Sequence, residues 1–332
     1  MTKNILITGA CGFIGHHLVE YFLEKTEHNL YIVDKLSYAS YGLNRLREIG
    51  ALKHPRVHVY IYDLTSKIDH GFIQELKDIN WIIHLAAETH VDNSISDPYY
   101  CIMNNINSTI NLLELARKLE HLERFLYFST DEVYGPALDG KLFKEDERHN
   151  PTNPYSASKS ASEMICRSYE NTYGIPLLIC NAMNVFGERQ HHEKFIPKCI
   201  KNILNDNTNY IHSYPSNASN DAPKAGSRFY IYAKNVASAV SFIMNNGNLG
   251  ENYNIPGQDE VANDELCDKI ANILGKEAIK EYMHHDEKRP GHDIRYGLDG
   301  TKLLQLGWKA EGNLDNYLQN LVAWTQANLN WL

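Results

Sequence analysis

The sequence has no paired cysteines at short spacing. Its six cysteines are scattered along 332 residues without a CxxC motif, which favours a reduced intracellular protein over a disulfide-stapled one. Positive charge is also in short supply, because 32 Lys and Arg face 41 Asp and Glu, for a formal net charge of −9. This balance argues against nucleic acid or an anionic membrane as the main partner, so an anionic ligand has to meet local cations.

Long hydrophobic runs are absent as well. No apolar stretch approaches the length that spans a bilayer, and the first ten residues, MTKNILITGA, pass directly into a strand-like run instead of a secretory signal. We therefore expect a cytoplasmic protein without a membrane partner. With 43% hydrophobic residues, the chain can bury a substantial core, as one large α/β domain or as a large domain and a smaller one.

Short, continuous apolar runs alternate with helical stretches in the first half of the chain. Continuous runs are typical of strands covered on both faces, as in a parallel sheet flanked by helices. They predict a doubly wound α/β fold. The expected strands are 4–8, 30–34, 57–63, 81–87, 124–130 and 176–185.

The pattern changes after residue 186 and predicts a smaller α/β domain. We expect the first domain to be 1–186, joined by part of 228–256, and the second to be mainly 187–332. The stretch 216–227 is the one low-complexity segment, which fits a solvated insertion or a mobile lid. Beyond residue 186 the expected elements are helices near 193–205, 263–274 and 314–328 and a strand–helix unit near 228–245.

Three glycines follow the first expected strand. In GACGFIG, Gly9, Gly12 and Gly15 open a helical stretch, where glycine permits a tight turn and lets the backbone approach a pyrophosphate at the helix N-terminus. The second strand ends about 20 residues later in Asp34, where a carboxylate is expected to hold ribose hydroxyls and to repel a 2′-phosphate. This predicts a dinucleotide site that favours NAD over NADP, although Lys35 adds a positive charge beside Asp34.

Two further clusters carry candidate catalytic groups. STDEVYG sets Thr130, Asp131 and Glu132 at the end of an expected buried strand, a costly position for adjacent acids unless they are solvated or a site uses them. In YSASK, Tyr155 and Lys159 are four residues apart, so on a helix they share a face. A lysine ammonium beside a phenol favours the phenolate and makes the tyrosine a usable base.

Together these motifs resemble the extended short-chain dehydrogenase/reductase superfamily. The resemblance covers nearly the whole chain, from GACGFIG and DKLSYAS through HLAAETHVDNSI, STDEVYG, PTNPYSASK and EKFIP to RPGHDIRY. The combination of STDEVYG, HVDNSI and RPGHD is the most specific part, and it is similar to nucleotide-sugar 4,6-dehydratases of the dTDP-glucose 4,6-dehydratase type. The resemblance implies a Rossmann fold and an NAD-dependent hydro-lyase of deoxysugar biosynthesis.

The resemblance also implies a division of labour among five residues. Tyr155, with a pKa lowered by Lys159, takes the C4 hydroxyl proton of the sugar while NAD accepts the C4 hydride, and Thr130 positions that hydroxyl. Glu132 then removes the C5 proton. Asp131, which must hold a proton at working pH, protonates the departing C6 hydroxyl. NADH finally returns its hydride to C6, which gives an NDP-4-keto-6-deoxyhexose.

The remaining implied contacts divide between a cofactor region, in residues 1–186, and a nucleotide-sugar region, mainly in 187–332. The implied cofactor-binding residues are Gly9, Gly12, Phe13, Ile14, Gly15, Asp34, Lys35, Asp63, Leu64, Leu85, Ala86, Ala87, Asn104, Tyr155, Lys159 and Val185. The implied substrate-binding residues are Thr89, Thr130, Asn184, Lys194, Phe195, Arg228, Asn254, Arg289 and His292. No metal is expected, because His191, His192, His284 and His285 lack carboxylate or thiol partners at ligand spacing.

The family also implies a homodimer, in which the helix near 100–119 and the Tyr155 helix form a four-helix interface. Two departures leave the substrate open: MNVFGE stands where dTDP-glucose enzymes commonly read SNNYGP, which changes Met183 and Val185, and 216–227 looks long. The substrate can be dTDP- or UDP-glucose, or UDP-N-acetylglucosamine dehydrated at 4,6 or another carbon pair. Epimerases and decarboxylases on this fold carry other residues at positions 131 and 132. A non-catalytic NAD-binding regulator would have lost one of the four acid–base residues, and all four are present.

Overall fold

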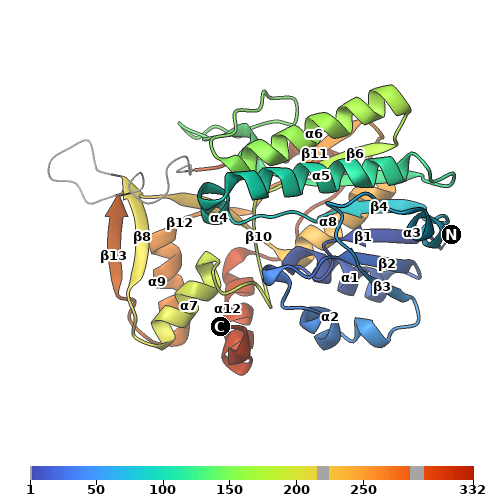
Figure 1. The fold of residues 1–332 in the computed structure, drawn as a ribbon. Coiled ribbons are helices and arrows are strands. Elements are labelled where there is room, and N and C mark those ends of the chain that lie inside the picture. The colour runs from blue at the N-terminus through green and yellow to red at the C-terminus, as the bar shows by residue number, and fades with distance from the viewer. Residues whose placement is uncertain (1, 215–223, 285–294) are drawn as a thin grey trace.

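A seven-stranded sheet forms the centre of the molecule (Figure 1). The structure, a computed structural model, describes residues 2–214, 224–284 and 295–332. The strands of the sheet are β1 (Asn4–Thr8), β2 (Asn29–Asp34), β3 (Val57–Ile61), β4 (Trp81–His84), β5 (Arg124–Thr130), β6 (Leu177–Ala182) and β11 (Glu251–Ile255). They lie in the order β11-β6-β5-β4-β1-β2-β3, and every neighbouring pair is parallel. This confirms the expected doubly wound sheet.

Helices cover both faces of this sheet (Figure 1). One face carries α1 (Phe13–Lys25), α2 (Asn44–Glu48), α8 (Ala233–Asn246) and α11 (Thr301–Leu306), and the other carries α3 (His70–Glu75), α5 (Pro98–Ala116) and α6 (Pro154–Tyr173). Along β1, Ile5 and Ile7 belong to the first hydrophobic core and Leu6 to the second, and all three are fully buried. The continuous apolar run therefore follows from burial on both sides.

A smaller α/β region packs beside the large sheet. Its elements are α7 (Phe195–Leu204), α9 (Asn263–Leu274) and α12 (Leu314–Ala327), with strands β7 (Asn184–Phe186), β8 (Asn209–Tyr214), β9 (Lys224–Ala225), β10 (Ser227–Tyr232), β12 (Asp259–Ala262) and β13 (Lys280–His284). The strands form two three-stranded sheets, β12-β10-β7 and β13-β8-β9. The sequence pattern missed the second sheet, because NYIHSY and KEYMH mix polar with apolar residues.

Three expected strands differ from those observed. β3 and β4 stop at Ile61 and His84, so Asp63 and the residues after β4 lie in loops at the carboxyl edge of the sheet. The expected strand 176–185 divides at Met183 into β6 and β7, which belong to different sheets. Helix α8 and strand β11 return to the large sheet. The expected division into domains at residue 186 stays a prediction.

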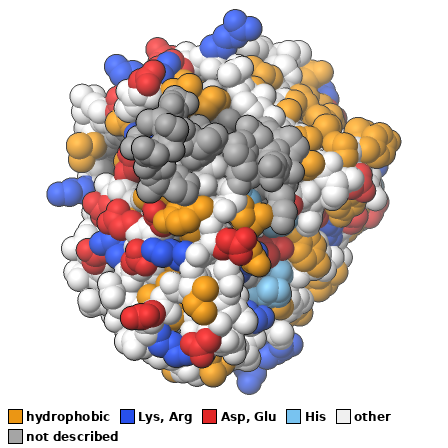
Figure 2. Space-filling view, turned by 90° about the vertical axis from the view of Figure 1, so that its left-hand side faces the viewer, with side chains coloured by type: hydrophobic (Ala, Val, Ile, Leu, Met, Phe, Trp, Pro, Cys, Tyr) orange, Lys and Arg blue, Asp and Glu red, His pale blue; other side chains and the backbone are white. Residues whose placement is uncertain are grey.

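The described surface mixes charges of both signs. On the face in Figure 2, acidic and basic side chains are interspersed among the side chains drawn there. Among the described side chains drawn on that face, this mixture does not form a continuous basic field for nucleic acid. Within the described ranges, no helix combines the length and the apolar character needed to cross a bilayer.

Candidate active site

A cavity of about 350 Å³ opens at the carboxyl edge of the large sheet. It lies where the strand order reverses between β1 and β4, the position at which doubly wound sheets bind ligands. All sixteen residues expected to bind the cofactor line this cavity, together with Asp131 and Glu132. Of the expected substrate-binding residues, Thr89, Thr130, Asn184, Lys194 and Phe195 line it as well.

The glycine loop leaves space that side chains would fill. Gly9 has a φ of +71°, and a Cβ added there would lie 2.8 Å from the backbone N and Cα of Ala86. A Cβ on Gly15 would lie 2.5 Å from the Cα of Ala10. Gly12 caps the N-terminus of α1 at the cavity wall. This arrangement suits a pyrophosphate, because the first-turn N–H groups and the helix dipole favour negative charge.

The Asp34 carboxylate is fixed at the end of β2 by backbone donors. Its Oδ2 accepts a hydrogen bond from the N–H of Cys11 at 2.9 Å, and its Oδ1 accepts one from the N–H of Leu36 at 2.8 Å. Burial raises the pKa of Asp34, and the two backbone bonds oppose that shift. The carboxylate therefore lines the cavity in a set orientation, as a group that holds ribose hydroxyls must.

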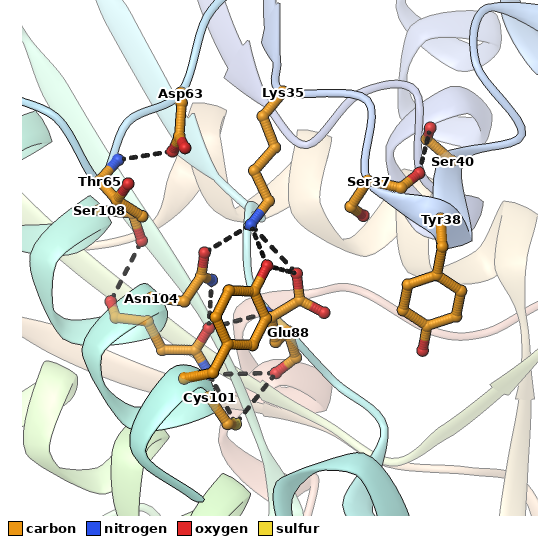
Figure 3. A network of polar contacts seen from close by, with 12 residues as sticks. Lys35, Ser37, Tyr38, Ser40, Asp63, Thr65, Glu88, Cys101, Asn104 and Ser108 are labelled. Carbon is orange, nitrogen blue, oxygen red and sulfur yellow. Dashed lines mark hydrogen bonds and ion pairs between the residues drawn. The ribbon is translucent and has the colours of Figure 1, made fainter. Parts of the chain in front are cut away.

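Lys35 is engaged in a network of its own. Figure 3 shows its side chain reaching toward Asn104 and Glu88. The ammonium donates to Oδ1 of Asn104 at 2.7 Å and to the hydroxyl of Tyr100 at 3.0 Å, and it lies 3.2 Å from Oε1 of Glu88. Burial opposes the charged form, but Tyr100 and Glu88 leave the pKa of Lys35 raised. The negative charge of Glu88 thus offsets the positive charge of Lys35, which would otherwise attract the 2′-phosphate of NADP.

The two adjacent acids occupy a short 3-10 turn, η3 (Asp131–Tyr134), directly after β5. Asp131 is 5% exposed, and burial, with a further contribution from the charge of Glu132, raises its pKa to about 8. Thr130 donates from Oγ1 to Oδ1 of Asp131 at 3.1 Å. Among the described residues, Oδ2 of Asp131 has no hydrogen-bond partner. An acid with a pKa raised in this way favours its protonated form at neutral pH, which is what the predicted role of Asp131 as the acid requires.

Tyr155 and Lys159 lie on α6, which Asn153 and Ser156 cap reciprocally at its start. Both are buried, and Nζ of Lys159 donates to the carbonyl oxygen of Phe128 at 2.7 Å. Burial lowers the pKa of Lys159 to about 8. Burial and the charge of Glu132 raise the pKa of Tyr155. Desolvation of the phenolate works against the expected acidification of Tyr155 by Lys159, which stays a prediction.

Two expected substrate contacts have other surroundings. Asn254 is fully buried, and its Nδ2 donates to the carbonyl oxygens of Phe143 and Asp299 at 2.9 and 3.0 Å. It does not line the cavity, and its side chain ties three segments together, so its expected contact with the substrate stays a prediction. Arg228 does not line the cavity either, but its charge lowers the pKa values of Asp131 and Glu132 against burial. Arg289 and His292 lie outside the described residues, as does His285.

Arg45 and Tyr296 are among the residues at the site that sequence reasoning missed. Arg45 of α2 is fully buried and lines the cavity, where its Nη1 donates to the carbonyl oxygens of Cys11 and Ala39 at 3.2 and 2.7 Å. No signal in the sequence marks this arginine as buried. Tyr296 donates to Glu132, and it was available as the last residue of RPGHDIRY. In the described part of the chain, no three metal-ligating side chains come together.

Comparisons with known proteins place the chain in a family. A family model described as GDP-mannose 4,6 dehydratase matches residues 6–321. The low-salt glycan biosynthesis protein Agl12 of Haloferax volcanii is 36% identical, over 96% of this chain and 97% of its own. The dTDP-glucose 4,6-dehydratase of Haemophilus influenzae is 35% identical, over 97% of each chain.

A solved structure extends the likeness to the whole fold. The crystal structure of DesIV, a dTDP-glucose 4,6-dehydratase from Streptomyces venezuelae with NAD and TYD bound, matches with a TM-score of 0.86 and 31% identity. The match covers 99% of this chain and 98% of that one. The chain therefore belongs to the GDP-mannose 4,6 dehydratase family, within the extended short-chain dehydrogenase/reductases.

Proposed function

We propose that this protein is a nucleotide-sugar 4,6-dehydratase, which converts dTDP- or UDP-glucose to the 4-keto-6-deoxyhexose. The observation that carries the proposal is the Asp131–Glu132 pair, which lines the same cavity as Tyr155 and Lys159. An enzyme that only moved a hydride to and from C4 would have no use for two buried acids of raised pKa beside the phenol. Epimerisation on the same fold is therefore the poorer explanation.

NAD is the cofactor, and the residues of the cavity fit it. The glycine loop would hold the pyrophosphate, Asp34 would hold the adenosine ribose, and Lys159 would hold the nicotinamide ribose. When bound, NAD supplies a hydride acceptor for C4 and a hydride donor for C6. The complete reaction is therefore redox-neutral.

Four side chains divide the work of proton transfer. The Tyr155 phenolate accepts the proton of the C4 hydroxyl and becomes the neutral phenol, and the buried Lys159 ammonium offsets the charge of the phenolate before this transfer. The ketone at C4 makes the C5 hydrogen acidic, so Glu132 can remove it. Asp131 gives its proton to the C6 hydroxyl, which leaves as water. A pKa of about 8 suits Asp131 to this task at neutral pH, because most of the acid is then protonated.

The substrate is tested by presenting purified protein separately with dTDP-glucose, UDP-glucose and UDP-N-acetylglucosamine. Mass spectrometry then follows the loss of one water. The expected result is loss of water from dTDP-glucose or UDP-glucose with formation of a 4-keto product. The nucleotide that reacts identifies the nucleotide base of the substrate. Loss of water from UDP-N-acetylglucosamine alone would mean that the substrate sugar is N-acetylglucosamine and not glucose. A change of configuration at C4 without a change of mass would overturn dehydration.

The same proposal includes a cytoplasmic homodimer. Helices α5 and α6 pack together, and they leave Tyr99, Met103 and Met164 exposed at 76%, 36% and 53%. Exposed apolar side chains on one helix pair support a four-helix interface with a second copy. All six cysteines are free thiols, which supports a reducing compartment. Sedimentation equilibrium of the parent and of Tyr99→Asp tests the dimer, because the variant should shift toward monomer.

A further inference from the structure

A fully buried carboxyl group that the proposed mechanism does not use lies one helical turn beyond Lys159. Glu163 of α6 is 0% exposed. Its Oε1 accepts hydrogen bonds from Oγ of Ser129 and, at 2.9 Å, from Nδ2 of Asn181. A buried acid is costly unless its partners compensate the lost hydration. The surroundings of Glu163 therefore call for a functional explanation.

The two donors connect Glu163 to the strand end that carries the acid pair. Ser129 directly precedes Thr130 at the end of β5. Nδ2 of Asn181, on β6, donates both to Glu163 and, at 3.2 Å, to the carbonyl oxygen of Thr130. One carboxylate thus joins α6, which carries Tyr155, to β5, which the acid pair directly follows, and to the neighbouring strand β6.

The second oxygen of Glu163 faces a different partner. Oε2 has no hydrogen-bond partner among the described residues, and it lies 3.6 Å from Nε2 of His149. Nδ1 of His149 is 2.9 Å from Oγ of Ser160, and the His149 side chain is 14% exposed. His149 therefore stands between the buried acid and solvent.

Burial raises the pKa of Glu163, and the charge of His149, the hydrogen bonds from Ser129 and Asn181 and the charge of Lys159 oppose that shift. In its ionised form, Glu163 acts in turn on Lys159. The Lys159 ammonium lies 4.2 Å from the centroid of the Tyr127 ring and donates to a backbone carbonyl. Burial lowers the pKa of Lys159, and Glu163 is the largest of the influences that raise it. The titratable groups that face Glu163 are His149, Lys159 and Cys166 around α6, Tyr127 on β5, Tyr134 on η3 and Cys180 on β6.

We propose that Glu163 is a positioning residue, which keeps Lys159 in its charged form and holds Tyr155 in register with the Asp131–Glu132 pair. The role of Lys159 in this inference rests on the proposed function. A neutral Glu163 would leave the buried lysine without this opposite charge, with only the Phe128 carbonyl and the Tyr127 ring to favour its charged form among the contacts named above. Lys159 would then lose its proton at lower pH, and Tyr155 would lose the charge that offsets its phenolate.

The test isolates C4 oxidation, which does not need the acid pair. In Glu132→Gln protein, bound NADH should form after mixing with the nucleotide sugar, and its rate is recorded by absorbance across pH. The midpoint is the pH at which the rate of NADH formation falls by half on the alkaline side. Adding Glu163→Gln should lower this midpoint by about one to three pH units, the range by which removal of an adjacent opposite charge shifts a pKa. Glu163→Asp, which keeps the charge, should restore the parental midpoint.

Controls separate this effect from damage to the fold. Glu170→Gln changes an acid on the same helix that pairs with Arg167 near the surface, and it should leave the midpoint unchanged. If Glu163→Gln does not fold, His149→Asn serves instead, because loss of the imidazole favours protonation of Glu163 and should shift the midpoint in the same direction. Equal midpoints in the parent and the Glu163 or His149 variants would overturn the inference. Absence of NADH in the Glu132→Gln parent would instead count against the proposed function.

Discussion

The hydroxyl of Tyr296 donates a hydrogen bond of 3.2 Å to Oε2 of Glu132, although the two residues are 164 positions apart in the chain. Nδ2 of Asn153 donates to the same oxygen, also at 3.2 Å. Burial raises the pKa of Glu132, and both bonds oppose that shift. Donors from two separate segments, one before α6 and one after β13, thus favour the ionised form of the proposed base against burial.

Tyr296→Phe should therefore move the acidic limb of the dehydration rate to higher pH. A hydrogen bond to a charged group contributes about 1.5–3 kcal/mol, which corresponds to a shift of about one to two pH units. The measurement is kcat for water loss as a function of pH. Tyr282→Phe, a half-exposed tyrosine on β13 that bonds Asp264, is the matched control and should leave the profile unchanged. An unshifted limb in Tyr296→Phe would mean that Glu132 is not the titrating base.

The pKa of Asp131 predicts the alkaline limb. Because the acid must be protonated to release the C6 hydroxyl, the rate of dehydration should fall as pH rises through about 8. Asp131→Asn should lose most of its activity at every pH, and C4 oxidation should survive in it. A parental rate that stays level well above that pH would exclude Asp131 as the acid.

The same group links pH to stability. The pKa of Asp131 is raised from 3.8 in folding, so its stabilising contribution is complete below pH 3.8 and is lost as pH rises through about 8. Asp131→Asn cannot ionise, so its melting temperature relative to the parent should climb across that window and then level off. Paired thermal melts over pH provide the measurement. A constant difference would contradict the raised pKa.

Cofactor choice should depend on Asp34 and Glu88. Asp34→Asn removes the charge that repels a 2′-phosphate. Glu88→Gln removes the negative charge that lies 3.2 Å from the Lys35 ammonium. We expect each variant to reduce the preference for NAD over NADP by at least about tenfold, or about 1.4 kcal/mol. Calorimetric titration of cofactor-stripped protein with both dinucleotides measures this ratio. Glu114→Gln, on the exposed side of α5, is the control. Release of NADP from denatured parent protein would contradict the assignment of Asp34.

The sequence predicted the sheet and the members of the cavity because both follow from local patterns. Continuous apolar runs reflect two-sided burial, and the carboxyl ends of parallel strands meet at one edge, so Gly9, Asp34 and Asp131 had to converge there. What escaped prediction depends on contacts between distant segments. No local sequence pattern marks Arg45 as buried. None shows that Asn254 donates hydrogen bonds to the carbonyl oxygens of Phe143 and Asp299.

The pKa of Tyr155 also depends on surroundings that a local sequence pattern does not reveal. Spacing placed Tyr155 and Lys159 on one face of α6, which is where the structure has them. Spacing gives the sign of their interaction but not the cost of burying the phenolate beside Glu132, which raises the pKa of Tyr155. A bound cofactor with a positive nicotinamide would change this balance, because it adds an opposite charge to the site.

The sharpest prediction divides the labour between Glu132 and Tyr155. If Glu132 is the C5 base, Glu132→Gln should still oxidise C4, because Tyr155, Lys159 and the cofactor site are untouched, but it should stall before elimination. Bound NADH should then accumulate, with little 4-keto-6-deoxy product and little exchange of the C5 hydrogen with deuterated solvent. Tyr155→Phe should give no NADH signal. Loss of a general base typically costs about 100- to 10,000-fold in rate, so absorbance and mass spectrometry resolve the contrast. Near-parental dehydration by Glu132→Gln would remove the acid pair from the mechanism and make an epimerase-like function the better explanation.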